Sequence, residues 1–111
     1  MKIAITTNEN SLKDEIALHF GRAKNFLIFD TEKKTFEIFS NPEISQKELP
    51  PDFLHRKGIN IVIAFSLGPM AYKKFKDYNI KMYKAIEGAI RENIQKFENN
   101  ELKELEKEDI F

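Results

Sequence analysis

The sequence contains no cysteine and no tryptophan, and only two of its 111 residues are histidine. Without cysteine the chain can form no disulfide and offers no thiolate, which is the usual protein ligand of iron–sulfur clusters and structural zinc. A metal bound by this chain would therefore need histidine or carboxylate ligands. The abundance of lysine, glutamate, isoleucine and phenylalanine is typical of thermophilic proteins, so we expect a thermophilic source.

The chain also lacks an excess of charge and a long apolar run. Its 18 basic and 18 acidic residues give a formal net charge of zero, so no overall field attracts nucleic acid or an anionic membrane surface. The first residues enter a strand pattern directly, and no apolar run approaches the roughly 20 residues of a spanning helix. We expect a cytoplasmic monomer or weak homodimer with no nucleic-acid or membrane partner.

What is present suits a single domain over residues 1–111, because 41% hydrophobic residues can fill one modest core. Helical spacing and turn residues predict helices at 52–57, 70–78 and 87–98. Short apolar runs, the second and third joined as a hairpin, predict strands at 2–6, 25–31, 35–41, 60–66 and 80–83.

Two polar stretches complete the chain. Residues 42–51 are punctuated by proline and predict a connection that could be mobile. Residues 99–111 form a charged tail, which is either solvated and partly disordered or docked in part. Docking would use the apolar residues of the tail, Leu102, Leu105 and Ile110.

The order of these elements constrains the topology. Strands joined through helices run parallel and are related by right-handed crossovers, whereas a hairpin pairs its strands antiparallel. The economical arrangement is an α/β fold with one five-stranded mixed sheet, in the order 3-2-1-4-5, and helices on both faces. Ligands in such sheets bind outside the carboxyl ends of the parallel strands. The loop after the first strand and the turn after the fourth both begin at such ends, so we expect them to be neighbours.

Both segments carry side chains or backbone groups suited to binding. An imidazole can bind a metal or transfer protons near neutral pH, glycine allows positive φ or a close backbone approach, and arginine presents a rigid fork of donors. The turn after the fourth strand precedes a helix whose first N–H groups can bind an anion, although Gly-Pro is also ordinary turn chemistry. The predicted binding residues are His19, Phe20, Gly21, Arg22, Ser66, Leu67, Gly68 and Pro69.

Other chemistries find little support in the sequence. There is no P-loop string and no glycine-rich dinucleotide motif. A nuclease with paired magnesium ions needs several carboxylates at adjacent strand ends, and the sequence offers no such set. Ser66 near His19 lacks an acidic partner for acyl transfer. His55 lies in a charged run that is typical of a solvated helix face.

Four features are informative together: the string HFGRA at residues 19–23, a following strand that ends in Asp30, the turn GPMA at residues 68–71, and the Glu87-Gly88 step into the last helix. In these features the chain resembles the dinitrogenase iron-molybdenum cofactor biosynthesis family, which includes NifX proteins and the carboxyl-terminal domain of NifB. The resemblance spans essentially the whole chain. It implies a ribonuclease H-like fold without nuclease activity, and binding rather than catalysis.

The resemblance further implies a small non-enzymatic carrier or assembly factor, since relatives carry iron-molybdenum cofactor or its iron–sulfur precursors between assembly proteins. His19 matches the family's histidine and would be the ligand of the metal cluster, with Arg22 and the loop at Gly68 shaping an anionic pocket. Many relatives have a glycine-rich segment, often with histidine or cysteine, where this chain has NPEISQKELPP at residues 41–51. The alternative hypothesis is a metal-free interaction or regulatory module that binds a small anionic metabolite or a protein partner.

Overall fold

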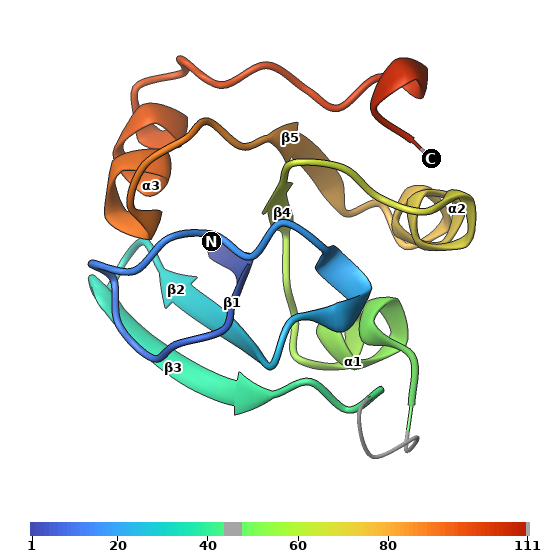
Figure 1. Ribbon diagram of the computed structural model, residues 1–111, viewed down its shortest axis with the longest axis horizontal. Helices are drawn as coiled ribbons and strands as arrows, with labels where there is room; N and C mark the ends of the chain where they lie inside the picture. The colour runs from blue at the N-terminus through green and yellow to red at the C-terminus, as the bar shows by residue number, and fades with distance from the viewer. Residues whose placement is uncertain (44–47, 111) are drawn as a thin grey trace.

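The computed structural model describes residues 1–43 and 48–110, and its centre is one five-stranded sheet (Figure 1). The strands are β1 Lys2–Thr7, β2 Asn25–Asp30, β3 Thr35–Ser40, β4 Ile61–Ala64 and β5 Lys81–Lys84. They lie in the order β3-β2-β1-β4-β5, which confirms the predicted topology. The antiparallel pairs are β1 with β2 and β2 with β3, and the parallel pairs are β1 with β4 and β4 with β5. The ribonuclease H-like classification says more than the strand order does, and it stays a prediction.

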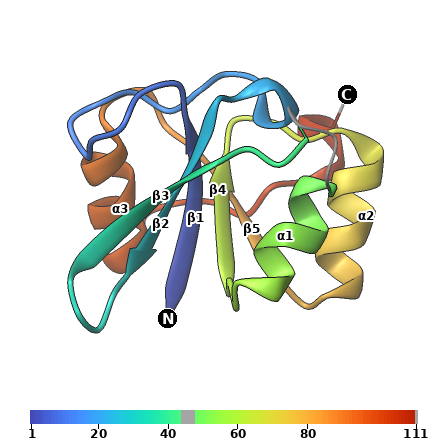
Figure 2. The same ribbon diagram turned by 90° about the horizontal axis from the view of Figure 1, so that it is seen from below.

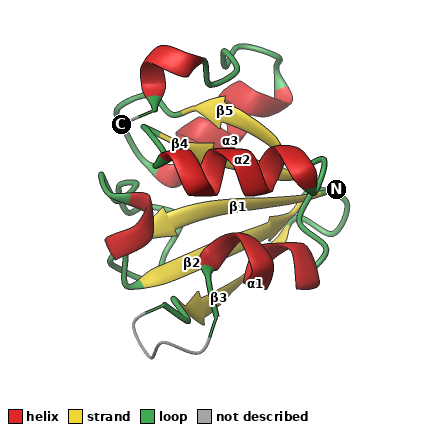
Figure 3. Cartoon of the chain, turned by 90° about the vertical axis from the view of Figure 1, so that its right-hand side faces the viewer, coloured by secondary structure: helices red, strands yellow, loops and turns green. Residues whose placement is uncertain are grey.

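Helices cover both faces of this sheet, as predicted. They are α1 Pro50–Arg56, α2 Pro69–Asp77 and α3 Ile90–Glu98. In Figures 2 and 3, α1 and α2 lie side by side on one face, and Figure 2 shows α3 on the other. Two 3-10 turns, η1 Phe20–Arg22 and η2 Lys107–Asp109, lie after β1 and near the end of the chain. None of the described helices has the length and apolar composition needed to span a bilayer.

Two apolar layers result from the alternation of side chains along the central strands. Ala4 and Val62 face α1 and α2, whereas Ile5 and Ile63 face α3. The central strands are therefore covered on both faces, which explains why β4 is an unbroken apolar run. β3 lies at an edge of the sheet and is mostly exposed, as expected for the second strand of the hairpin.

The last helix begins at Ile90 rather than at the predicted residue 87. The cause is Gly88, whose φ of +126° is incompatible with a helix and strained for any side chain. Ala89 follows in extended conformation, and its N–H donates to the Glu92 carboxylate at 3.3 Å. The Glu87-Gly88 step is thus a turn before the helix and not its first residues.

The charged tail runs along β5 and then reaches Leu67, the residue before the turn into α2. The N–H of Lys84 donates to the carbonyl of Lys103 at 2.7 Å, and the N–H of Leu105 donates to the carbonyl of Met82 at 3.0 Å. Leu102 and Leu105 are buried, while the intervening lysine and glutamate side chains are exposed. These contacts fit the docked alternative. The predicted mobility of residues 42–51 falls partly on 44–47, which lie outside the described residues.

Candidate functional site

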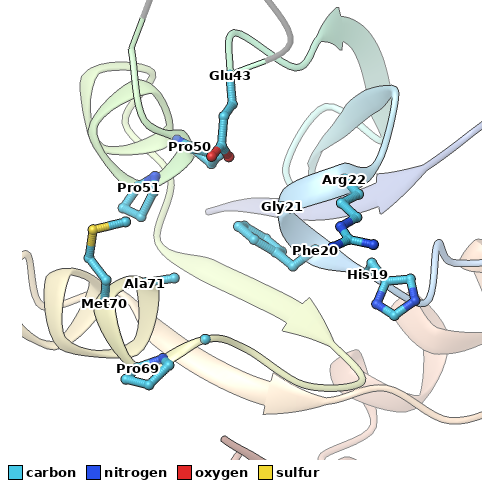
Figure 4. Close-up of a pocket in the computed structure, with 11 residues that line it drawn as sticks. His19, Phe20, Gly21, Arg22, Glu43, Pro50, Pro51, Pro69, Met70 and Ala71 are labelled. Carbon is cyan, nitrogen blue, oxygen red and sulfur yellow. The ribbon is translucent and has the colours of Figure 1, made fainter. Parts of the chain in front are cut away.

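A cavity of about 370 Å³ opens beyond the carboxyl ends of β1 and β4 (Figure 4). Residues 19–22, which contain η1, form one wall, and residues 68–71 at the start of α2 form another. Pro50 and Pro51 at the start of α1 contribute a third wall, together with Glu43 from the loop after β3. The predicted neighbourhood of the two loops is therefore confirmed.

Six of the eight predicted binding residues line this cavity: His19, Phe20, Gly21, Arg22, Gly68 and Pro69. The other two, Ser66 and Leu67, do not line it. Leu67 is fully buried in the core beside α1 and α2, and Ser66 is half-buried. The placement of these residues is a finding, whereas their role in binding stays a prediction.

Phe20 holds the η1 wall in place. Its ring lies 5.4 Å from the ring of Phe26 on β2 and 5.6 Å from that of Phe75 on α2, and only 5% of the residue is exposed. One side chain of η1 is therefore packed into the core, and its neighbours His19 and Arg22 are left exposed on either side. Apolar packing thus orients the two polar side chains of the HFGRA string toward solvent at the cavity.

Asn41 joins this wall to the loop that carries Glu43. The Asn41 side chain is 1% exposed, and its amide donates to the carbonyls of Gly21 at 3.3 Å and Ala23 at 2.9 Å. Its side-chain oxygen accepts the N–H of Glu43 at 3.0 Å. A buried amide with these partners fixes the two loops relative to each other, because losing either contact would leave polar atoms unpaired.

Neither the backbone conformation nor crowding requires glycine at position 21. The positive-φ glycines of the described chain are Gly58 and Gly88, so η1 does not need glycine for its dihedral angles. A Cβ at position 21 would stand 3.6 Å from the Glu43 carboxylate, which is an ordinary contact distance. The missing side chain leaves cavity space between η1 and Glu43.

The polar groups of the cavity walls are largely unpaired. Within residues 1–43 and 48–110, the Arg22 guanidinium has no ion-pair partner and the His19 imidazole has no hydrogen-bond partner. The N–H groups of Met70 and Ala71, at the start of α2, likewise have no acceptor among the described residues. One cation, one imidazole and two N–H groups are thus available to a ligand that carries negative charge.

An ion pair between α1 and α2 keeps the remaining walls together. Asp52 accepts hydrogen bonds from the Tyr78 hydroxyl at 2.5 Å and from Lys74 at 2.9 Å and 3.1 Å. These two donors, Tyr78 first, lower the pKa of Asp52, and the same contacts raise the pKa of Tyr78 and of Lys74. His55 stacks on the Tyr78 ring, with 3.9 Å between centroids, and is exposed as predicted for a helix face.

The donor set of the cavity does not make a site for a bare metal ion. Within the described residues, no group of three or more histidine, aspartate or glutamate side chains is arranged to hold one. The cavity offers one imidazole, one carboxylate from Glu43 and the thioether of Met70, which is 53% exposed. With the His19 imidazole as the main candidate ligand, the cavity fits a metal cluster that brings most of its own ligands and needs few from the protein.

Comparison with known proteins decides the family. A family model described as "Dinitrogenase iron-molybdenum cofactor" matches residues 1–100 of the chain. The chain belongs to this family. The uncharacterized protein MJ0580 of Methanocaldococcus jannaschii is 32% identical over 113 residues, which cover 96% of this chain and 92% of that protein.

Two solved structures have a fold similar to that of this family member. The apo form of the orange protein from Desulfovibrio gigas superposes with a TM-score of 0.85 at 21% identity, over 94% of this chain and 92% of that one. A candidate NifB protein from Thermotoga superposes with a TM-score of 0.80 at 27% identity, with the same two coverages. The first of these likenesses shows a common fold alone.

In this family member, sequence reasoning missed five of the residues that line the cavity: Glu43, Pro50, Pro51, Met70 and Ala71. Met70 and Ala71 stand within the GPMA turn and could have been included with Gly68. The prolines could have been found as well, because α1 precedes the parallel strand β4 and so begins at the same sheet edge as α2. Glu43 gives no signal of its own in the sequence.

Proposed function

We propose that this protein is a non-enzymatic carrier or assembly factor that holds an iron-containing cluster, such as a precursor of iron-molybdenum cofactor, in the cavity beside η1. The observation that carries the proposal is that His19, Arg22 and the first N–H groups of α2, none of which has a partner among residues 1–43 and 48–110, meet in one cavity. The family membership supplies the class of cargo. Cytoplasmic location and a ribonuclease H-like classification belong to the same proposal.

Each wall has a distinct part in this proposal. His19 supplies an imidazole to one exposed metal atom of the cluster, and Arg22 offsets part of its negative charge. The N–H groups of Met70 and Ala71 donate to sulfide or other anionic atoms at the cluster surface. Phe20 and the proline rings cover the remaining surface and exclude water from it.

A single imidazole makes the attachment exchangeable. With no cysteine in the chain, the cluster would keep most of its own ligands and could pass to an acceptor by replacing one protein ligand. The partners that this chemistry requires are cofactor or iron–sulfur assembly proteins that donate and accept the cluster. Transient holding, rather than permanent incorporation, is the activity we propose.

The test is anaerobic titration of the protein with isolated iron-molybdenum cofactor. We expect His19→Ala to bind at least about tenfold more weakly than the unaltered protein, because it loses the coordinate bond. The control is His55→Phe, which removes the other imidazole of the chain outside the cavity and keeps a ring that can stack on Tyr78. Equal affinity of the His19 variant and the unaltered protein would remove the proposed ligand role.

A second candidate function, a metal-free module for a small anionic metabolite or a protein segment, draws on another feature of the cavity. Most of its lining is apolar, from Phe20, the prolines and Ala71, while Arg22 offers one cation. This combination suits a ligand with an apolar body and one acidic group. Metal that remains bound after anaerobic purification would count against this module and in favour of the carrier.

A further inference from the structure

Glu43 places a negative charge in the cavity that is proposed to hold an anion. Figure 4 shows its side chain extending from the loop after β3 toward the proline wall, inside the ring of lining residues. Its carboxylate lies close to Gly21, where a Cβ would be 3.6 Å from the nearer oxygen. The carboxylate and the η1 turn therefore face the same volume.

The position of Glu43 is built into the fold. The buried side chain of Asn41 accepts the N–H of Glu43 and at the same time donates to the carbonyls of Gly21 and Ala23. The backbone N–H of Asn41 donates to the carbonyl of Lys24 at 2.9 Å. The backbone of Glu43 is thus tied to both ends of the η1 wall through a residue that is 1% exposed.

Among the described residues, no cation pairs with this carboxylate. The Glu43 side chain forms no ion pair or hydrogen bond with another residue in the part of the chain that the structure describes. Arg22 lines the same cavity and is unpaired too, so the two opposite charges share the cavity without a direct contact. An anionic ligand that enters is attracted by one wall and repelled by another.

We propose that Glu43 sets the strength of cargo binding by repelling the anionic cluster, so that the cavity holds it weakly enough to release it to an acceptor. The inference rests on the proposed carrier function. Glu43 is exposed, so solvent screens part of its charge. Because few charged groups line the cavity, one carboxylate there still has a measurable share in the affinity for an anion. Glu43 acts on the affinity through its charge and is not a ligand of the cluster.

The test compares Glu43→Gln with the unaltered protein in the anaerobic titration with isolated iron-molybdenum cofactor. Glutamine has nearly the same shape without the charge, and we expect roughly 3- to 10-fold tighter binding. The matched control is Glu37→Gln, which removes an exposed carboxylate of β3 outside this cavity and gives the chain the same net charge. Its affinity should stay within about twofold of the unaltered protein.

The salt dependence separates electrostatics from a structural effect. Because dissolved ions screen charges, the Glu43→Gln affinity should fall more steeply with salt than that of the unaltered protein, in which attraction and repulsion partly cancel. Glu43→Asp, which keeps the charge, should bind like the unaltered protein. Weaker binding by Glu43→Gln would identify Glu43 as a ligand and overturn the proposal. Equal binding would overturn it as well, because the charge would then have no effect on the affinity. If the unaltered protein and every variant fail to bind, the carrier function and this inference fail together.

Discussion

Gly68 allows the free N–H groups at the start of α2 to be tested without disturbing the fold. Gly68 is the N-cap of α2, with φ −72° and ψ 160°, an extended conformation that any residue adopts. A Cβ built there meets no atom within 4 Å, and no side chain of the described residues caps the helix. A serine at this position could accept the N–H of Met70 or Ala71, which have no acceptor among the described residues.

The expected gain in the free energy of unfolding has two parts. Serine at an N-cap is better than glycine by a few tenths of a kcal/mol. Replacing glycine where the conformation suits other residues adds about 0.4–1 kcal/mol, because the unfolded chain loses freedom. For Gly68→Ser the sum is about 1 kcal/mol, which corresponds to roughly 4 °C in Tm for a domain of this size.

Gly68→Ala is the matched control, because alanine adds the same Cβ without a hydroxyl. Alanine is a poor N-cap, and this cost offsets its entropic gain, so we expect its Tm to lie near that of the unaltered protein. Thermal unfolding followed by circular dichroism measures all three proteins. If Gly68→Ser is no more stable than Gly68→Ala, the N–H groups of α2 are already satisfied and the reasoning fails.

The same pair of variants bears on the carrier function. A serine that caps α2 uses an N–H group that the cargo is proposed to need, so Gly68→Ser should bind iron-molybdenum cofactor about 3- to 10-fold more weakly than Gly68→Ala. Anaerobic titration measures this difference. Higher stability with equal binding would show that these N–H groups cap a helix and do not hold the cargo.

Three further changes test how the walls are held. Asn41→Ala leaves the carbonyls of Gly21 and Ala23 without their donor and should cost about 2–4 kcal/mol in urea unfolding; an unchanged midpoint would contradict the role of Asn41. Leu105→Ala, at a residue 6% exposed, should cost about 2–3 kcal/mol and speed amide exchange in β5, whereas a free tail would leave both unchanged. Tyr78 and Lys74 lower the pKa of Asp52. The ionised carboxylate therefore contributes its full share to the free energy of unfolding above the ordinary carboxyl pKa, and this share is lost as pH falls through the lowered pKa. The advantage of the unaltered protein over Asp52→Asn should therefore disappear between about pH 5 and pH 2, and a constant difference in urea midpoint would refute the linkage.

The strands and their order could be predicted because they depend on local pattern and simple connection rules. Both strands of the hairpin were placed to within a residue, since their alternation is clear and their loop is short. The start of α3 was missed because Glu87 and Gly88 resemble a first helical turn, and a sequence does not reveal that Gly88 has φ +126°. The tail remained ambiguous because its charged residues outnumber the leucines that are buried in the structure.

The candidate site was predicted in outline, since strand ends locate loops but not side chains. The rule for parallel sheets brought η1 and the turn before α2 together. It could not tell that Leu67 points into the core while Gly68 faces the cavity. The sequence could not predict that Glu43 lines the cavity either. Its position depends on the hydrogen bonds of Asn41, which join segments about 20 residues apart in sequence.

The course of the tail has a practical consequence for anyone who labels this protein. Leu67, directly before the cavity turn, donates its N–H to the carbonyl of Asp109 at 3.4 Å and forms a bridge with Ile110. A tag or fluorophore attached just beyond residue 110 would therefore lie near the turn that precedes α2. A change that the label causes in this turn could be mistaken for an effect of ligand binding. Figure 2 shows the N-terminus at the opposite end of β1 from η1, which lines the cavity, so Met1 is the safer point of attachment.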